Sequence, residues 1–238
     1  YLYFGMLALC TMVPLAFFLK PRPPAAPVQT RIHAEGSDDG LVLGWSPHAV
    51  QGLLWVAVVC CCTAMAMPIV HLVSHATDLG VPRVRAAEML SLLFTAAFFS
   101  RIAFGVLADR IGGVKTLLIS SSCQAVMLTA FIFVDTTAGL YVAALLFGLG
   151  FTGIMPCYAL ILRLLFPVSE MGWRIATQYL FAAMGMALGG WLGGFVFDLS
   201  GGYPAAFAVG VGFNLVNLVC IGVIYVRQRV TGLSPLPV

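Results

Sequence analysis

The chain has 238 residues, of which 61% are hydrophobic and 9% are charged, and its formal net charge is +3 at pH 7. About 25% of the residues of an ordinary soluble domain are charged, so this chain has too little polar surface to solvate a globule of its length. The composition excludes a soluble domain and indicates an all-α, polytopic membrane protein.

Apolar runs that suit a bilayer recur along the whole chain. A helix needs about 20 residues to cross the hydrocarbon core. The runs lie at residues 2–19, 51–73, 86–107, 117–134, 140–165, 175–197 and 205–226. The first run has no initiator Met before it and lacks the basic region and cleavage site of a signal peptide. We therefore interpret residues 1–20 as the end of a transmembrane helix and the sequence as part of a longer one.

One linker interrupts the apolar runs, at residues 21–48. Its first part contains Pro21, Pro23, Pro24 and Pro27, which favour an extended chain, and its second part is polar. Such a segment cannot build a hydrophobic core. It separates the first helix from the six that follow.

The segment 105–115 reads GVLADRIGGVK and is predicted to form a short polar loop between two membrane helices. Glycines permit a tight reversal there, and a neighbouring acid and base can interact with helix ends. The segment resembles the signature loop of the major facilitator superfamily, Gly-x-Leu-Ala-Asp-Arg-x-Gly followed by basic residues. By that resemblance the loop is cytoplasmic and acts as a conformational latch through Gly105, Asp109, Arg110, Gly112 and Lys115. The residues at 113 and 114 are not basic, which departs from the family pattern.

The resemblance implies a fold of two six-helix halves that rock around a central site, each half built from two inverted three-helix repeats. Residues 1–20 are then the end of the sixth helix, 21–48 the cytoplasmic linker, 49–229 the C-terminal bundle and 230–238 a cytoplasmic tail. The two repeats fall at about 51–134 and 140–226. The N-terminal half is an expected partner outside this chain.

Basic residues give the expected orientation. If the segment 105–115 is cytoplasmic, alternation places nine of the twelve Lys and Arg residues inside, in agreement with the positive-inside rule. They are Lys20, Arg22, Arg31, Arg110, Lys115, Arg163, Arg174, Arg227 and Arg229.

Arg101 is the outstanding charge within a predicted span. It precedes Gly105 by four residues, or about 6 Å of helix. A cation at this place can bind a substrate carboxylate through two parallel hydrogen bonds. It can equally extend to the cytoplasmic interface or pair with the loop. The residues alone leave these alternatives open.

The segment 100–105, which reads SRIAFG, resembles the eighth helix of the monocarboxylate-transporter family. In that family an arginine at this place binds the substrate carboxylate and works with an aspartate one turn earlier. Arg101 matches the arginine, whereas Ala97 replaces the aspartate, so the proton coupling of that pair does not carry over. The segments 69–80 and 166–174 are similar to bacterial members of the same branch, which includes oxalate–formate antiporter-like proteins. The resemblance implies a bacterial inner-membrane protein with a small organic anion as its substrate.

Three further ionisable residues are candidates for a proton-carrying or gating role near the outer face. Glu88 can carry a proton, reach water or pair with Arg85. His71 and His75 are four residues apart and share a helix face, yet they lack the acidic residue of a His-Glu-x-x-His metal site. A structural role, a gate or proton transfer are all compatible with this pair.

Polar residues within the other spans are candidates for helix contacts or for a cavity lining. Asn and Gln in lipid form hydrogen bonds between helices, which is the role we expect for Asn214 and Asn217. We keep Tyr158 and Gln178 as candidate substrate-binding residues.

Glycine spacing predicts close helix packing. In lipid, small residues let helix backbones approach. The run 175–197 contains two such series, Gly185, Gly189 and Gly193, and then Gly190 and Gly194. The run 140–165 contains Gly148, Gly150 and Gly153 before Pro156, which predict a second contact and a bend. These glycines can serve helix packing, or they can let the helix bend during transport.

No motif for enzymatic chemistry is recognisable in the sequence. The seven cysteines lie in apolar runs without metal-ligand spacing, and no nucleotide-binding loop or catalytic triad is found. We therefore expect a secondary active transporter of a small organic anion, with protons as a coupling ion. We expect no enzyme activity, no cofactor, no metal and no nucleic acid. The alternatives are a drug or sugar transporter of the same fold, or a sensor of that fold that does not transport.

Overall fold

The computed structural model describes residues 2–18 and 40–232. The larger part of the predicted linker, three of the predicted cytoplasmic cations (Lys20, Arg22 and Arg31) and the tail after residue 232 lie outside these ranges. The chain divides into two units, Tyr1–Gly36 and Ser37–Val238. In the first unit the structure describes one helix, α1 (Leu2–Phe18), which contains Pro14.

The second unit confirms the all-α prediction, because its described residues form helices with no sheet. The helices are α2 (Pro47–Asp78), α3 (Arg83–Ile111), α4 (Gly113–Phe133), α5 (Thr137–Phe151), α6 (Ile154–Leu165), the 3-10 turn η1 (Val168–Glu170), α7 (Met171–Ser200) and α8 (Tyr203–Val230). Among the described residues, six segments are long and apolar enough to cross a membrane, with α5 and α6 forming one of them.

Local sequence explains where several helices begin and end. Ser46 caps α2 by accepting a hydrogen bond from the Ala49 N–H at 3.3 Å, and Thr136 caps α5 through Gly139 at 3.2 Å. Gly201 ends α7 with a φ of +73°, a conformation that favours glycine. The reversals between membrane helices are therefore short.

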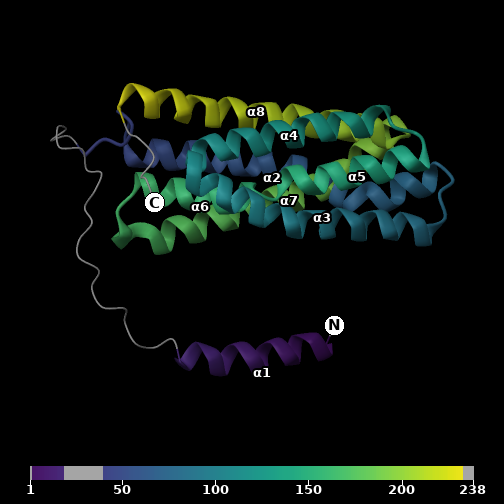
Figure 1. The fold of residues 1–238 in the computed structure, drawn as a ribbon, viewed down its shortest axis with the longest axis horizontal. Coiled ribbons are helices and arrows are strands. Elements are labelled where there is room, and N and C mark those ends of the chain that lie inside the picture. The colour runs from purple at the N-terminus through teal and green to yellow at the C-terminus, as the bar shows by residue number, and fades with distance from the viewer. Residues whose placement is uncertain (1, 19–39, 233–238) are drawn as a thin grey trace. The chain divides into compact units, whose positions relative to one another are not determined.

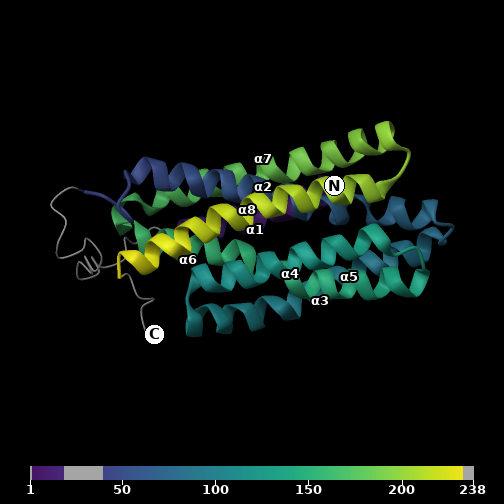
Figure 2. The same cartoon turned by 90° about the horizontal axis from the view of Figure 1, so that it is seen from above.

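Two groups of helices form the bundle (Figure 1), and Figure 2 shows α2, α7 and α8 along one side and α3, α4 and α5 along the other. α2 packs most extensively against α7 and α8, while α5 packs against α3 and α4, and α4 meets α8 between the groups. Each predicted three-helix repeat thus contributes helices to both groups. Contacts between helices far apart in the sequence hold the bundle together.

The interface between α2 and α7 depends on glycines. A Cβ at Gly185 would lie 2.6 Å from the Val59 carbonyl oxygen, and a Cβ at Gly189 would overlap the Thr63 carbonyl oxygen. The first predicted glycine series is therefore confirmed as a packing surface. The second series is wrong in this role, because a Cβ at Gly190 would make only ordinary contact and one at Gly194 would meet nothing within 4 Å. The 100° rotation per residue places Gly190 at the edge of the contact with α2, beside Val70, and Gly194 on an open face.

The predicted bend before Pro156 is confirmed as a break between α5 and α6 at residues 152–153. Gly148 lets the backbone approach the Leu93 carbonyl of α3, and Gly150 lets it approach Cys123 of α4. A break at membrane depth needs partners for its freed carbonyls. Ser100 donates to the Leu149 carbonyl, Ser120 to the Gly150 carbonyl at 2.6 Å, and Thr152 to the Gly148 carbonyl at 2.8 Å.

The segment 105–115 differs from the predicted loop. α3 continues through residue 111, and only Gly112 separates it from α4. Gly112 has a φ of +85°, which lets one residue reverse the chain without a longer connection. Gly105 lies inside α3, and a Cβ there would meet nothing within 4 Å, so close packing does not require a glycine at this position.

Candidate functional site

Arg101 lies well inside α3 because the signature segment is helical. It precedes Ile111, the last residue of α3, by ten residues, or about 15 Å at 1.5 Å per residue, whereas the predicted loop began at Gly105, about 6 Å away. Its side chain is exposed, and no hydrogen bond or ion pair to another described residue satisfies it. The guanidinium is therefore an unneutralised charge on the surface of the bundle.

Aromatic side chains flank Arg101 on the same side of α3. Phe98 and Phe94 precede it by three and seven residues, which places them on neighbouring positions of one helix face, and both are exposed. The face thus combines one cation with apolar rings. Such a surface can contact an anion whose remaining part is apolar.

Tyr158 is nearly inaccessible, with 1% of its surface exposed. Its hydroxyl donates a 2.8 Å hydrogen bond to Asn217 Oδ1, and Asn217 Nδ2 donates to the Ser121 hydroxyl and to Asn214 Oδ1. Asn214 in turn donates to the Ser121 carbonyl at 2.9 Å. This cluster joins α4, α6 and α8, so the predicted interhelical role of Asn214 and Asn217 is confirmed.

Gln178 connects α7 to α2. Its side-chain Nε2 donates to the Leu54 backbone carbonyl at 3.1 Å, and its Oε1 accepts from Gln51 Nε2 at 3.4 Å. It also borders a narrow crevice between α6 and α7 that Tyr158 lines. The two candidate binding residues are therefore neighbours at one crevice, and each already has hydrogen-bond partners in the bundle.

A buried arginine extends this network. Arg174 is 2% exposed, and its Nη1 donates to Gln51 Oε1 at 3.2 Å. Its Nε and Nη2 donate to Glu170 at 2.8 and 2.6 Å, and its guanidinium stacks 3.7 Å above the Phe166 ring. Sequence reasoning counted Arg174 only as a cytoplasmic cation. The acid four residues earlier, just before an apolar run, was the signal that could have identified the pair.

The two histidines of α2 contact α7 and α8. His71 Nε2 lies 3.0 Å from the Gly190 carbonyl oxygen, and its ring fills the space beside Gly193. His75 is 4% exposed and packs against Tyr203 and Phe207, while its Nε2 has no hydrogen-bond partner among the described residues. Nor does any group of three His, Cys, Asp or Glu residues in the described part of the chain form a metal-binding cluster.

Glu88 lies on the exposed surface of α3, where it accepts a 2.8 Å hydrogen bond from the Tyr141 hydroxyl of α5. The same hydroxyl lies 3.3 Å from the Arg85 carbonyl. The described side chains of Arg85 and Glu88 form no ion pair. Glu88 is hydrogen-bonded to Tyr141 instead. Glu88 is also remote in sequence from Arg101 on α3, by thirteen positions.

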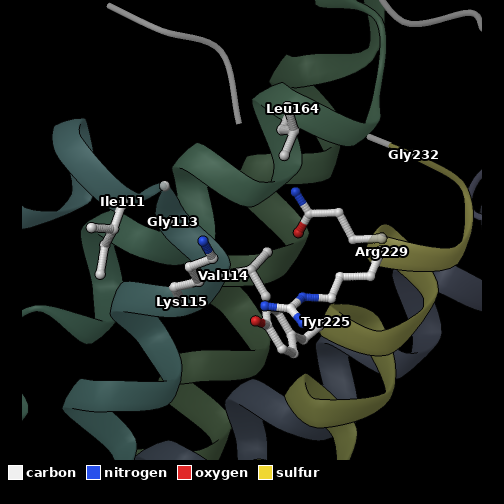
Figure 3. A pocket seen from close by; sticks show the side chains of 10 residues that line it. Ile111, Gly113, Val114, Lys115, Leu164, Tyr225, Arg229 and Gly232 are labelled. Atoms are coloured by element: carbon white, nitrogen blue, oxygen red, sulfur yellow. The ribbon is translucent and has the colours of Figure 1, made fainter. Parts of the chain in front are cut away.

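The predicted latch residues divide into two sets. Gly112 and Lys115 line a cavity of about 280 Å³ between the ends of α3, α4, α6 and α8 (Figure 3), whereas Gly105, Asp109 and Arg110 do not line it. Asp109 and Arg110 are exposed in the last turn of α3. The structure therefore brings only part of the signature segment to a cavity.

The curated relatives that this chain matches are named as transporters. The bovine (Bos taurus) monocarboxylate transporter 13 is 27% identical over 155 residues, which are 64% of this chain and 36% of the relative. The MFS-type transporter opdF of Penicillium oxalicum is 27% identical over 170 residues, which are 70% of this chain and 39% of the relative. The chain thus spans just over a third of the length of the curated relatives it matches.

Solved structures share the fold. The POT family transporter PepTSo superposes with a TM-score of 0.68 at 19% identity, over 75% of this chain and 38% of that one. The E. coli fucose:proton symporter FucP superposes with a TM-score of 0.66 at 16% identity, over 93% of this chain and 54% of that one. The family model described as Major Facilitator Superfamily matches residues 54–237. Six segments of its described residues are long and apolar enough to cross a membrane, and this chain is a multi-pass membrane protein that belongs to the major facilitator superfamily.

Proposed function

We propose that this chain is the C-terminal half of a secondary active transporter that moves a small organic anion, with a monocarboxylate as the model substrate. The observation that carries the proposal is Arg101, an exposed guanidinium on α3 without an acidic partner among the described residues. A charge in a membrane helix costs at least about 2.5 kcal/mol at the bilayer centre. A substrate carboxylate would neutralise it through two parallel hydrogen bonds.

Two further observations support this substrate class. Two of the curated relatives are named monocarboxylate transporter 13, from cattle and rat. The exposed rings of Phe94 and Phe98 beside Arg101 suit the apolar part of a small carboxylate. The N-terminal half would cover this face and complete the site between the two halves.

Coupling to protons is part of the proposal. The fucose:proton symporter shares the fold, and Glu88, His71 and His75 are the candidate proton carriers on this chain. His75 is the strongest of the three on geometric grounds, because its Nε2 is buried without a hydrogen-bond partner among the described residues. Tyr158 and Gln178 remain proposed as residues that reach the substrate when the crevice between α6 and α7 widens.

The test is uptake of labelled lactate and oxalate into proteoliposomes that contain the full-length transporter, with and without an imposed pH gradient. We expect Arg101→Gln to abolish uptake, because the carboxylate loses the guanidinium that would neutralise it. Arg101→Lys keeps the charge but loses the bidentate geometry, so we expect its apparent affinity to fall about tenfold. Arg85→Gln removes the same charge from the other end of α3 and serves as the matched control.

The outcomes separate the alternatives. Uptake by Arg101→Gln equal to that of the wild type would remove Arg101 from the site. Carboxylate binding without uptake would favour a sensor of the same fold. Acceleration by an inward proton gradient would support symport, and its loss in His75→Gln would identify the carrier.

A further inference from the structure

A cavity in the described part of the chain lies away from Arg101, at the end of the bundle where α3 passes into α4. Its volume is about 280 Å³. The ends of four helices contribute to its wall; the lining residues are Ile111, Gly112, Gly113, Val114, Lys115, Leu164, Tyr225, Gln228, Arg229 and Gly232. The transport proposal assigns no role to this cavity.

The charge of the cavity wall is entirely positive. Lys115 and Arg229 line it from α4 and α8, and no acidic side chain is among its lining residues. Figure 3 shows the Arg229 side chain extending across the cavity from α8 toward α4. Its guanidinium lies 4.8 Å from the Tyr225 ring. Neither cation forms an ion pair with a described carboxylate, so two positive charges face one cavity without neutralisation.

Backbone donors add to this potential. α4 begins at the cavity. Its N-cap residue is Gly112, which has no side chain to accept a hydrogen bond from the first N–H groups of the helix. The N–H groups at the start of a helix are left without partners within the helix, and the helix dipole is positive at this end. The buried Gln228 also lines the wall. An anion with several oxygen acceptors matches the two cations and these helix N–H groups.

The helix surfaces one turn from the cavity suit an anion that carries an apolar chain. One turn deeper than Lys115, Ile119 of α4 is 42% exposed, and one turn deeper than Arg229, Val226 of α8 is 59% exposed. Both helices therefore present a cation at the bundle end and an apolar side chain one turn further into the membrane. A phospholipid has this same order, with its phosphate at the interface and its acyl chain deeper. Basic pockets between transmembrane helices are typical binding sites for anionic headgroups.

We propose that this cavity binds the phosphate group of an anionic membrane lipid, with Lys115 and Arg229 as its cationic contacts. The acyl chain lies along Ile119 and Val226, and the first N–H groups of α4 donate to the phosphate oxygens. A bound phosphate neutralises both cations and links α4 to α8 at the bundle end. This site is independent of Arg101 and of the transported substrate.

The experiment measures lipid binding to the full-length transporter in detergent by native mass spectrometry, with phosphatidylglycerol, phosphatidylcholine and inorganic phosphate as probes. We expect phosphatidylglycerol to bind more tightly than phosphatidylcholine. Lys115→Gln and Arg229→Gln should each weaken phosphatidylglycerol binding about fivefold, since each removes one cation near the membrane surface. Arg229→Lys should retain most of the affinity. Arg163→Gln is the matched control, because Arg163 is an exposed cation of the same bundle end that does not line the cavity.

The readouts distinguish a lipid from free phosphate. If inorganic phosphate competes with phosphatidylglycerol and shows the same sensitivity to the two variants, the phosphate site stands and a free anion also occupies it. If phosphatidylglycerol binds equally to Lys115→Gln, Arg229→Gln and Arg163→Gln, the proposal is overturned. A thermal unfolding curve for each variant without lipid shows that the fold is retained.

Discussion

Arg174 and Arg101 show how two arginines of one bundle acquire different roles. The Arg174 guanidinium is enclosed by Glu170, Gln51 and the Phe166 ring, and each of its nitrogens has a hydrogen-bond partner. Arg101 is exposed and has no such enclosure among the described residues. A buried charge is tolerated only with paired donors and acceptors, so Arg174 is a structural connection, whereas Arg101 has its donors free for a ligand.

The ion pair between buried Arg174 and partly exposed Glu170 predicts a stability effect. Glu170→Gln removes the countercharge of a buried guanidinium, and we expect it to lower the free energy of unfolding by about 2 kcal/mol. Glu88→Gln is the control, because Glu88 is an exposed acid with a single hydrogen bond from Tyr141 and should change stability by under about 1 kcal/mol. Thermal unfolding of both variants in detergent measures the difference. Equal melting temperatures for the two variants would contradict the structural role of the pair.

At the scale of the helix, α7 shows that identical residues on one element differ in function. Gly185 and Gly189 lie where α7 meets the backbone of α2, and Gly194 lies on an open face. The α5–α6 break shows the same dependence on neighbours, because Ser100 of α3 and Ser120 of α4 satisfy the carbonyls that the break frees. Sequence reasoning did not identify these serines, since their partners are 49 and 30 residues away.

The two glycine faces predict opposite signs for one substitution. Gly189→Ala places a Cβ against the Thr63 carbonyl, a backbone atom that cannot move aside, and should destabilise the bundle. Gly194→Ala has open space and should stabilise α7 by up to about 1 kcal/mol through higher helix propensity. Melting temperatures of the two variants test this. The packing argument is wrong if Gly189→Ala is as stable as Gly194→Ala.

At the scale of the whole molecule, Lys and Arg residues are distributed unevenly between the two ends of the bundle. One end carries three of them. Lys115 follows the turn between α3 and α4, Arg163 precedes the turn between α6 and α7, and Arg229 lies at the end of α8. Arg83 and Arg85 begin α3 at the opposite end. Positive charges near helix ends favour the cytoplasmic side, so this distribution predicts the orientation of the chain.

Labelling from one side of the membrane tests that orientation. Ser169→Cys lies in the 3-10 turn between α6 and α7, and Asp135→Cys lies in the turn between α4 and α5. We expect a membrane-impermeant maleimide to label Asp135→Cys in intact cells and Ser169→Cys only after permeabilisation. Both variants also carry Cys10→Ser and Cys123→Ser, because Cys10 is exposed and Cys123 is half-buried; the remaining cysteines are buried and should give a low background. Labelling of both variants in intact cells would contradict the predicted topology.

The sequence by itself determined the all-α class, the number of membrane helices in the bundle and the break before Pro156, because apolar run length and glycine or proline position are local properties of the chain. It also indicated the family, through the segment that contains Asp109 and Arg110. Only the tertiary structure decided which glycines meet a neighbouring backbone, and that Arg174 is enclosed while Arg101 is exposed. These properties depend on which face of each helix meets which partner, and contacts between helices far apart in the chain fix that choice.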